Sequence, residues 1–152
     1  ETILVTPGRV GFTDANSLRH FIGTYGLETC VGLAIYDPVL KIGGVSHVQF
    51  NIAAKYLEKL LSGNYARGEE FDSFDFSQFR DDAFRLFSLV TLMGGQRYKV
   101  YTFNAEDRDY SEDIQKVIQS TFSLFEPQII SHHYRNERAF RLDTRNGEIE
   151  EI

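Results

Sequence analysis

Residues 28–50, ETCVGLAIYDPVLKIGGVSHVQF, contain two candidate strands that predict the centre of the fold. The first, residues 30–36, is almost wholly apolar and rich in β-forming residues, as expected for a strand covered on both faces. The second, residues 45–50, follows a proline-containing turn and a pair of glycines. These strands carry the only cysteine of the chain, Cys30, and a histidine, His47. A tight return between two adjacent strands can bring these side chains together.

The rest of the sequence mixes strand and helix patterns. Segments rich in β-forming residues predict strands at residues 3–5, 10–12, 98–103, 129–134, 139–142 and 148–152, with a hairpin turn at Asn146-Gly147. Apolar residues at a helical period predict helices at residues 14–22, 51–63 and 79–90, and a helix that begins near Asp109 and ends before Pro127. We therefore expect residues 1–152 to form a single α+β domain, with a mixed, largely antiparallel sheet and helices packed on it.

The composition describes an ordinary globular domain. The chain has 152 residues, of which 42% are hydrophobic and 25% charged, and this length suffices to bury a core without disulfides or a metal. Its formal net charge is −6, whereas proteins that bind the phosphate backbone need a basic face. Nucleic acid is therefore not expected as a partner.

The cysteine content and the hydropathy of the sequence indicate the cellular compartment of the protein and whether it inserts into a membrane or binds a metal. One cysteine cannot form an internal disulfide, which is typical of a reducing compartment. No apolar run approaches the roughly twenty residues that span a bilayer, and no signal-peptide pattern is present. The sequence has one cysteine and no H-x3-H spacing, and the adjacent His132 and His133 would point to opposite faces of a strand, so no metal site is indicated. We expect a cytoplasmic protein without membrane insertion and without a bound metal.

Cys30 and His47 have the residue types of a nucleophile and its base. A thiol attacks effectively only as the thiolate, and a neighbouring imidazole can take its proton at neutral pH. Gly26 and Gly32, on either side of the cysteine, allow close approach of a substrate and backbone amides aimed at an oxyanion. Thr24 can orient the imidazole through its other ring nitrogen. The same residue types also fit a small buried cysteine and a structural histidine, so the spacing alone leaves both interpretations open.

The order and spacing of these residues resemble the core of CheD, the family of chemoreceptor glutamine deamidases. The resemblance rests on TYGLETCV at residues 24–31, YDP at 36–38, GGVSH at 43–47 and RAFRLDTRNGEI at 138–149. The catalytic set of that family is a threonine, a cysteine and a histidine at the spacing found here. The resemblance therefore implies Cys30 as the nucleophile, His47 as the base and Thr24 as the orienting residue. It also implies a CheD-like deamidase domain over residues 1–152.

The activity implied by the resemblance is hydrolysis of a glutamine side-chain amide to glutamate through a cysteine thioester. Cys30 attacks the amide carbonyl, nearby backbone amides hold the oxyanion, and His47 protonates the departing ammonia before it activates water. A glutamate methyl ester can pass through the same intermediate. The implied substrates are methyl-accepting chemoreceptors of bacterial chemotaxis, a CheC-type phosphatase is the implied partner, and no cofactor is required.

Several departures from the family pattern keep other functions open. Glu28-Thr29 stand where CheD proteins usually have Gly-Ser, and Val48-Gln49-Phe50 stand where they usually have Leu-Pro after the histidine. Residues 102–104 stand near the place of a glycine-rich stretch of the family, and paired glycines of the family are replaced around residues 132–136. One alternative is a catalytically inactive CheD-like binding module for a chemotaxis phosphatase or receptor. Another is a deamidase effector with a different protein target.

Overall fold

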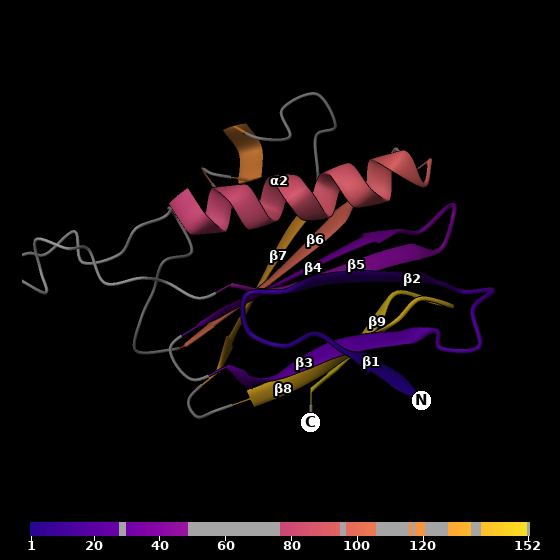
Figure 1. The fold of residues 1–152 in the computed structure, drawn as a ribbon, viewed down its shortest axis with the longest axis horizontal. Helices are drawn as coiled ribbons and strands as arrows, with labels where there is room; N and C mark the ends of the chain where they lie inside the picture. Colours follow the sequence, from indigo (N-terminus) through magenta and orange to yellow (C-terminus); the bar gives the residue numbers. More distant parts are fainter. Residues whose placement is uncertain are drawn as a thin grey trace, which may run out of the picture.

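Three layers build the described part of the chain in the computed structural model (Figure 1). A five-stranded sheet lies in the middle, with helix α2 (Ser77–Leu92) over one face and a four-stranded sheet against the other. This arrangement confirms the predicted α+β fold. The structure describes residues 1–27, 30–48, 77–94, 97–105, 116, 118–120, 128–134 and 138–151.

The two strands predicted within residues 28–50 lie in the five-stranded sheet. Its order is β2-β5-β4-β6-β7, and every neighbouring pair is antiparallel except β6 and β7. The strands are β2 (Val10–Asp14), β5 (Ile42–Val48), β4 (Val31–Asp37), β6 (Lys99–Ala105) and β7 (Gln128–Tyr134). These bounds confirm the corresponding predicted strands to within a few residues.

Strand β4 has no charged residue before Asp37, its last residue, because both of its faces are covered. All seven of its residues are buried. Val31, Leu33 and Ile35 belong to the core under α2, whereas Ala34 and Tyr36 belong to the core between the two sheets. The prediction of a buried central strand is confirmed, with β5 and β6 as its hydrogen-bonded neighbours.

The four-stranded sheet has the order β1-β3-β8-β9. Its strands are β1 (Thr2–Leu4), β3 (Phe21–Leu27), β8 (Arg138–Asp143) and β9 (Glu148–Glu151). Strands β1 and β3 are parallel, and the other neighbouring pairs are antiparallel. The hairpin predicted at Asn146-Gly147 is confirmed between β8 and β9, and Gly147 has a φ of 77°, which favours glycine.

Helix α2 confirms the helix predicted at residues 79–90. Its apolar residues at helical spacing pack on the five-stranded sheet: Ala83, Leu86, Phe87 and Val90. Gly94 follows the helix with a φ of 96°, the left-handed conformation common at helix C-termini. Among the described ranges, neither α2 nor another helix combines the length and apolarity needed to cross a membrane.

The helix predicted at residues 14–22 is wrong. Strand β2 ends at Asp14, whose carboxylate accepts hydrogen bonds from the backbone N–H groups of Asn16 and Ser17. Such local side-chain bonds compete with the hydrogen bonds of a helix. The chain then turns and enters β3 at Phe21.

The expectation of one sheet is also wrong, because the strands divide into two. Ile22, Gly23 and Thr24 of β3 are all buried, and Ile22 belongs to the core between the two sheets. Strand β3 therefore belongs to the four-stranded sheet and not to the central five-stranded sheet.

The helix predicted at residues 51–63 lies outside the described residues. Of the last predicted helix, residues 116 and 118–120 are described and are helical.

Candidate active site

His47, the predicted base, lies on β5 with its side chain fully buried. Val45, which shares its face of the strand, belongs to the core between the sheets. Across the ladder, His47 is paired with Gly32 of β4. Phe140 of β8 comes within 2.7 Å of the position that a Cβ on Gly32 would take. The absence of a side chain at Gly32 therefore lets an aromatic ring pack beside the histidine.

A hydrogen bond between the two sheets holds the imidazole. Thr24 of β3, which is also buried, places its Oγ1 2.7 Å from Nδ1 of His47. The Thr24 hydroxyl donates to the carbonyl oxygen of Val5 at 2.6 Å. Because its single proton is used on Val5, the hydroxyl can only accept from His47. Nδ1 therefore carries the ring proton, and Nε2 of the neutral ring has a lone pair.

The surroundings favour this neutral, basic form of the imidazole. Burial lowers the pKa of His47 below its ordinary value, because the charged form loses hydration. Nε2 is buried and has no hydrogen-bond partner among the described residues. An unprotonated ring nitrogen in this state is suited to accept a proton from a thiol.

Cys30, the predicted nucleophile, directly precedes β4 at the end of the strand where His47 lies. It is half-buried and packs against the core between the sheets. Because Gly32 is opposite His47, the register puts Cys30 diagonally across from the imidazole and on the same face. Diagonal neighbours in an antiparallel pair lie about 7–8 Å apart, a separation that an aromatic ring can bridge. The candidate nucleophile thus directly precedes the strand that pairs with the strand of the candidate base, and Thr24 contacts the base directly.

Two parts of this site have no clear counterpart in the sequence analysis. Val5 contributes a backbone carbonyl oxygen, which every residue type provides, so its identity carries no signal. The second part is the ring pair of Phe103 and Phe140, stacked with 3.8 Å between centroids, next to Gly32. Phe140 and Leu142 alternate with the charged Arg141 and Asp143 in the second half of β8, and this pattern is a signal that places Phe140 in the core.

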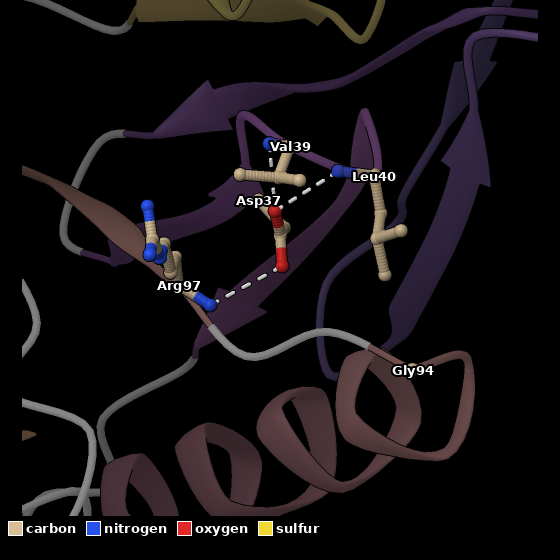
Figure 2. A pocket seen from close by; sticks show the side chains of 5 residues that line it. All are labelled: Asp37, Val39, Leu40, Gly94 and Arg97. Atoms are coloured by element: carbon tan, nitrogen blue, oxygen red, sulfur yellow. Dashed lines mark hydrogen bonds between the residues drawn. The ribbon is translucent and has the colours of Figure 1, made fainter.

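A pocket of about 360 Å³ lies at the opposite end of β4 from Cys30 (Figure 2). Its lining includes Asp37, Val39, Leu40, Gly94 and Arg97. Oδ1 of Asp37 accepts the backbone N–H groups of Val39 and Leu40. Its Oδ2 accepts the N–H of Arg97. The carboxylate is thus engaged in fixing the turn after β4, and we assign it a structural role.

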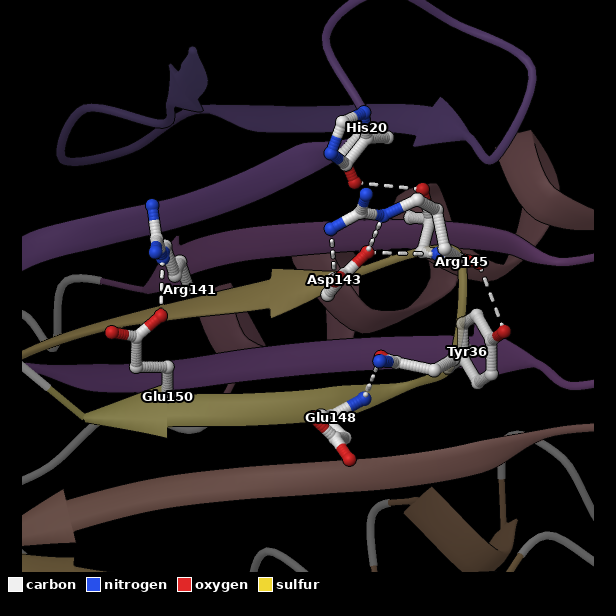
Figure 3. A network of polar contacts seen from close by, with 9 residues as sticks. His20, Tyr36, Arg141, Asp143, Arg145, Glu148 and Glu150 are labelled. Atoms are coloured by element: carbon white, nitrogen blue, oxygen red, sulfur yellow. Dashed lines mark hydrogen bonds and ion pairs between the residues drawn. The ribbon is translucent and has the colours of Figure 1, made fainter.

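Charged side chains form a network on the four-stranded sheet and its β8–β9 hairpin (Figure 3). Arg145 donates to both carboxylate oxygens of Asp143 and holds the pKa of that carboxyl below its ordinary value. Arg141 pairs with Glu150 at 2.6 Å and lies 4.1 Å from the ring centroid of Phe21. Both ion pairs join residues of the β8–β9 hairpin, and because each includes a solvent-exposed side chain we assign them a small structural role. In the described residues, no group of histidine, cysteine or acidic side chains is placed to hold a metal.

Several curated proteins named as probable chemoreceptor glutamine deamidases CheD are similar to parts of this chain. The protein of Pyrococcus horikoshii is 51% identical over 35 residues, which are 23% of this chain and 22% of that protein. The protein of Caldanaerobacter subterraneus is 37% identical over 49 residues, 31% of this chain and 30% of that protein. The protein of Clostridium acetobutylicum is 48% identical over 42 residues, 26% of this chain and 25% of that protein. The similar segments thus span less than a third of the length of these relatives.

No family model matches the chain. Among solved structures, the chain is similar to the crystal structure of the hypothetical protein YfiH of Bacillus licheniformis, at 12% identity and a TM-score of 0.47, over 81% of this chain and 49% of that one. The resemblance to CheD that the sequence motifs indicate is confirmed over short segments of the chain.

Proposed function

We propose that this chain is a protein-glutamine deamidase with a CheD-like fold, in which residues 1–152 form one domain. Cys30 is the nucleophile, His47 the general base and Thr24 the residue that orients the imidazole. The observation that supports this most is the chain of hydrogen bonds from Val5 through Thr24 to Nδ1 of His47. This chain of hydrogen bonds leaves the lone pair of the ring on Nε2. The His47 side chain and Cys30 lie on the same face of the five-stranded sheet, the face toward the core between the two sheets.

The reaction begins when Nε2 of His47 takes the proton of the Cys30 thiol, and the thiolate attacks the carbonyl carbon of a glutamine side chain. Backbone N–H groups near Cys30 bind the negative oxygen of the tetrahedral intermediate. The imidazolium gives its proton to the amide nitrogen, the C–N bond breaks and ammonia leaves, which produces a thioester. Water then attacks the thioester, passes a proton through His47 to the departing sulfur, and glutamate is released. A glutamate methyl ester reaches the same thioester with methanol as the leaving group.

In this scheme Thr24 accepts the Nδ1–H of His47 in both the neutral and the protonated state of the ring. Nδ1 keeps its proton whether Nε2 is empty or protonated, so the bond from Nδ1 to the Thr24 hydroxyl persists through the cycle. The imidazole therefore does not need to rotate between its role as base and its role as acid. Preorganisation of this kind lowers the barrier of each proton transfer.

Methyl-accepting chemoreceptors of bacterial chemotaxis are the proposed substrates, because the similar curated proteins are named as probable chemoreceptor glutamine deamidases. The proposed setting is the cytoplasm, with a CheC-type phosphatase as a partner of the same domain. No cofactor enters the scheme, since the thiol, the imidazole and water supply every group that reacts.

Incubation with a panel of chemoreceptor cytoplasmic fragments tests this function. We expect ammonia release and a gain of about one mass unit at each converted glutamine, because hydrolysis exchanges an amide NH₂ for OH. Peptide mass spectrometry locates the site, and Cys30→Ala is the matched control that releases no ammonia. A wild-type protein that binds a fragment yet leaves every glutamine unchanged would contradict the deamidase function and favour the binding module. Conversion of glutamine only in other proteins would instead favour the effector alternative.

A further inference from the structure

The connection from β1 to β2, residues 5–9, contains a tight turn. The N–H of Arg9 donates to the carbonyl oxygen of Thr6 at 3.0 Å, which closes a β-turn. Pro7 and Gly8 are the two central residues, and Gly8 has a φ of 75°. Proline followed by a glycine with positive φ is the signature of a type II turn. The four residues of the turn thus specify its conformation locally.

This turn runs directly into a β-bulge opposite His47. The N–H of Gly8 donates to the carbonyl oxygen of His47 at 2.9 Å, and the N–H of His47 donates to that of Arg9 at 3.3 Å. Two residues of one strand therefore face one residue of its neighbour, as in a bulge whose first residue is a left-handed glycine. The regular register of β2 and β5 begins at the next pair, Val10 and Ser46. A bulge of this kind bends the strand and re-aims a side chain.

The same connection also determines the state of the His47 ring. The carbonyl oxygen of Val5 accepts the proton of the Thr24 hydroxyl, and this forces the hydroxyl to accept from Nδ1. Residues 5–9 therefore hold His47 in two ways. Gly8 and Arg9 form hydrogen bonds with its backbone. The carbonyl oxygen of Val5 acts on its ring through the Thr24 hydroxyl. A shift of this segment would disturb both.

We propose that Gly8 is a positioning residue for His47: its left-handed conformation sets the bulge that aims the imidazole and keeps the ring proton on Nδ1. This inference rests on the proposed deamidase function. A residue with a Cβ disfavours the positive φ of Gly8. Gly8→Ala therefore relaxes the turn, weakens the backbone bonds to His47 and moves the Val5 carbonyl away from Thr24.

Three variants separate positioning from general loss of stability. Gly8→Ala introduces the strained side chain next to His47. Gly8→Asn restores the conformation, because asparagine tolerates positive φ better than other residues with a side chain. Gly94→Ala is the matched control: Gly94 has a φ of 96° and lies after α2, beside the pocket at the far end of β4.

The first readout is the ¹⁵N NMR spectrum of the His47 ring, which distinguishes the two neutral tautomers without any substrate. We expect the Nδ1–H tautomer alone in the wild type, in Gly8→Asn and in Gly94→Ala, and a mixture of both tautomers in Gly8→Ala. The second readout is ammonia release. We expect kcat to fall by about tenfold to a hundredfold in Gly8→Ala, with KM within about twofold of the wild type, since misaligned groups slow the chemical step.

A single Nδ1–H tautomer together with wild-type kcat in Gly8→Ala would overturn the proposal. So would an equal loss in Gly94→Ala, which would assign the effect to stability. If Gly8→Ala does not fold, Pro7→Ala loosens the same turn and is judged by the same two readouts. If the wild type releases no ammonia, the deamidase function fails, and the tautomer measurement still decides by itself whether Gly8 sets the state of His47.

Discussion

Oγ1 of Thr24 and Nδ1 of His47 lie 2.7 Å apart, although their strands belong to different sheets. The bond crosses a closely packed core, so its length depends on how the two sheets sit against each other. We therefore expect a change that moves one sheet relative to the other to weaken this bond and its preference for a proton on Nδ1. This links the packing of the fold to the chemistry proposed for the site.

Thr24→Val removes the hydroxyl of this bond at nearly constant volume. We expect the free energy of unfolding to fall by about 1–3 kcal/mol, because the Val5 carbonyl and the His47 Nδ1–H both lose a buried partner. We also expect ammonia release to slow by about tenfold or more, since neither tautomer is then imposed. Thr24→Ser keeps the hydroxyl and is the matched control. Urea unfolding and ammonia release measure the two effects, and wild-type values for both in Thr24→Val would refute this role of Thr24.

Acid is expected to destabilise the protein through His47. Burial lowers the pKa of the folded-state imidazole below the ordinary value of 6.5, so the unfolded chain takes up a proton that the folded protein does not. The stabilising contribution of the neutral imidazole is present above pH 6.5 and is lost as the pH falls through the lowered pKa. Urea unfolding across this range should show a wild-type stability that falls more steeply with acid than that of His47→Gln. Parallel pH profiles for the two proteins would contradict this prediction.

Gly32→Ala is expected to disturb both stability and activity. The new Cβ would lie 2.7 Å from Phe140 Cε1 and 3.1 Å from Leu27 Cδ1, on the face that His47 shares. Overpacking of this kind costs about 1–3 kcal/mol in the free energy of unfolding. Gly44→Ala is the control, because its Cβ would meet Leu86 of α2 at 2.5 Å, on the other face of the sheet. Both variants should unfold at lower urea concentration, and only Gly32→Ala should lose ammonia release in the folded state.

Asp37→Ala tests whether the pocket at the far end of β4 contributes to the activity of the candidate site. The carboxylate accepts the backbone N–H groups of Val39, Leu40 and Arg97, so its removal should lower the free energy of unfolding by about 1–3 kcal/mol. Ammonia release per folded molecule should stay at the wild-type value, because Asp37 and Cys30 are at opposite ends of the strand. Asp37→Asn, which keeps one oxygen acceptor, should lose less stability. A loss of activity at full folding would show that the pocket belongs to the site.

Sequence patterns predict the centre of this fold better than its second layer. Residues 31–36 carry no charged side chain and are rich in β-forming residues, which favours a strand with both faces covered, so β4 could be recognised. Strand β3 could not, because Gly23 and Gly26 weaken its strand pattern. Its ladder with β8 is also irregular between Thr24 and Leu27, and Gly26 there has a φ of 72°. Its pairing depends on contacts with β1 and β8 that are distant in the sequence.

The candidate site also has features that the sequence predicts and features that only the structure reveals. The chemistry of Cys30, His47 and Thr24 is visible in residue types and spacing, because only a few side chains act as nucleophile, base or hydroxyl. The proton position on His47 is not visible, since it depends on the backbone carbonyl of Val5. Gly8 has a turn signature in the sequence, but its place opposite His47 follows from the register of β2 and β5.

The most direct test of the central claim is a cycle of Cys30→Ala, His47→Ala and the double variant, measured as kcat/KM for ammonia release from a fragment that binds. We expect Cys30→Ala to abolish release and His47→Ala to lower it by about a hundredfold or more, the factor typical of general acid–base catalysis. The double variant should be no worse than Cys30→Ala alone, because residues that act as one unit give effects that do not add. Binding of the fragment should survive in all of them. Ammonia release by Cys30→Ala at the wild-type rate, or none by a folded wild type that binds the fragment, would contradict the account.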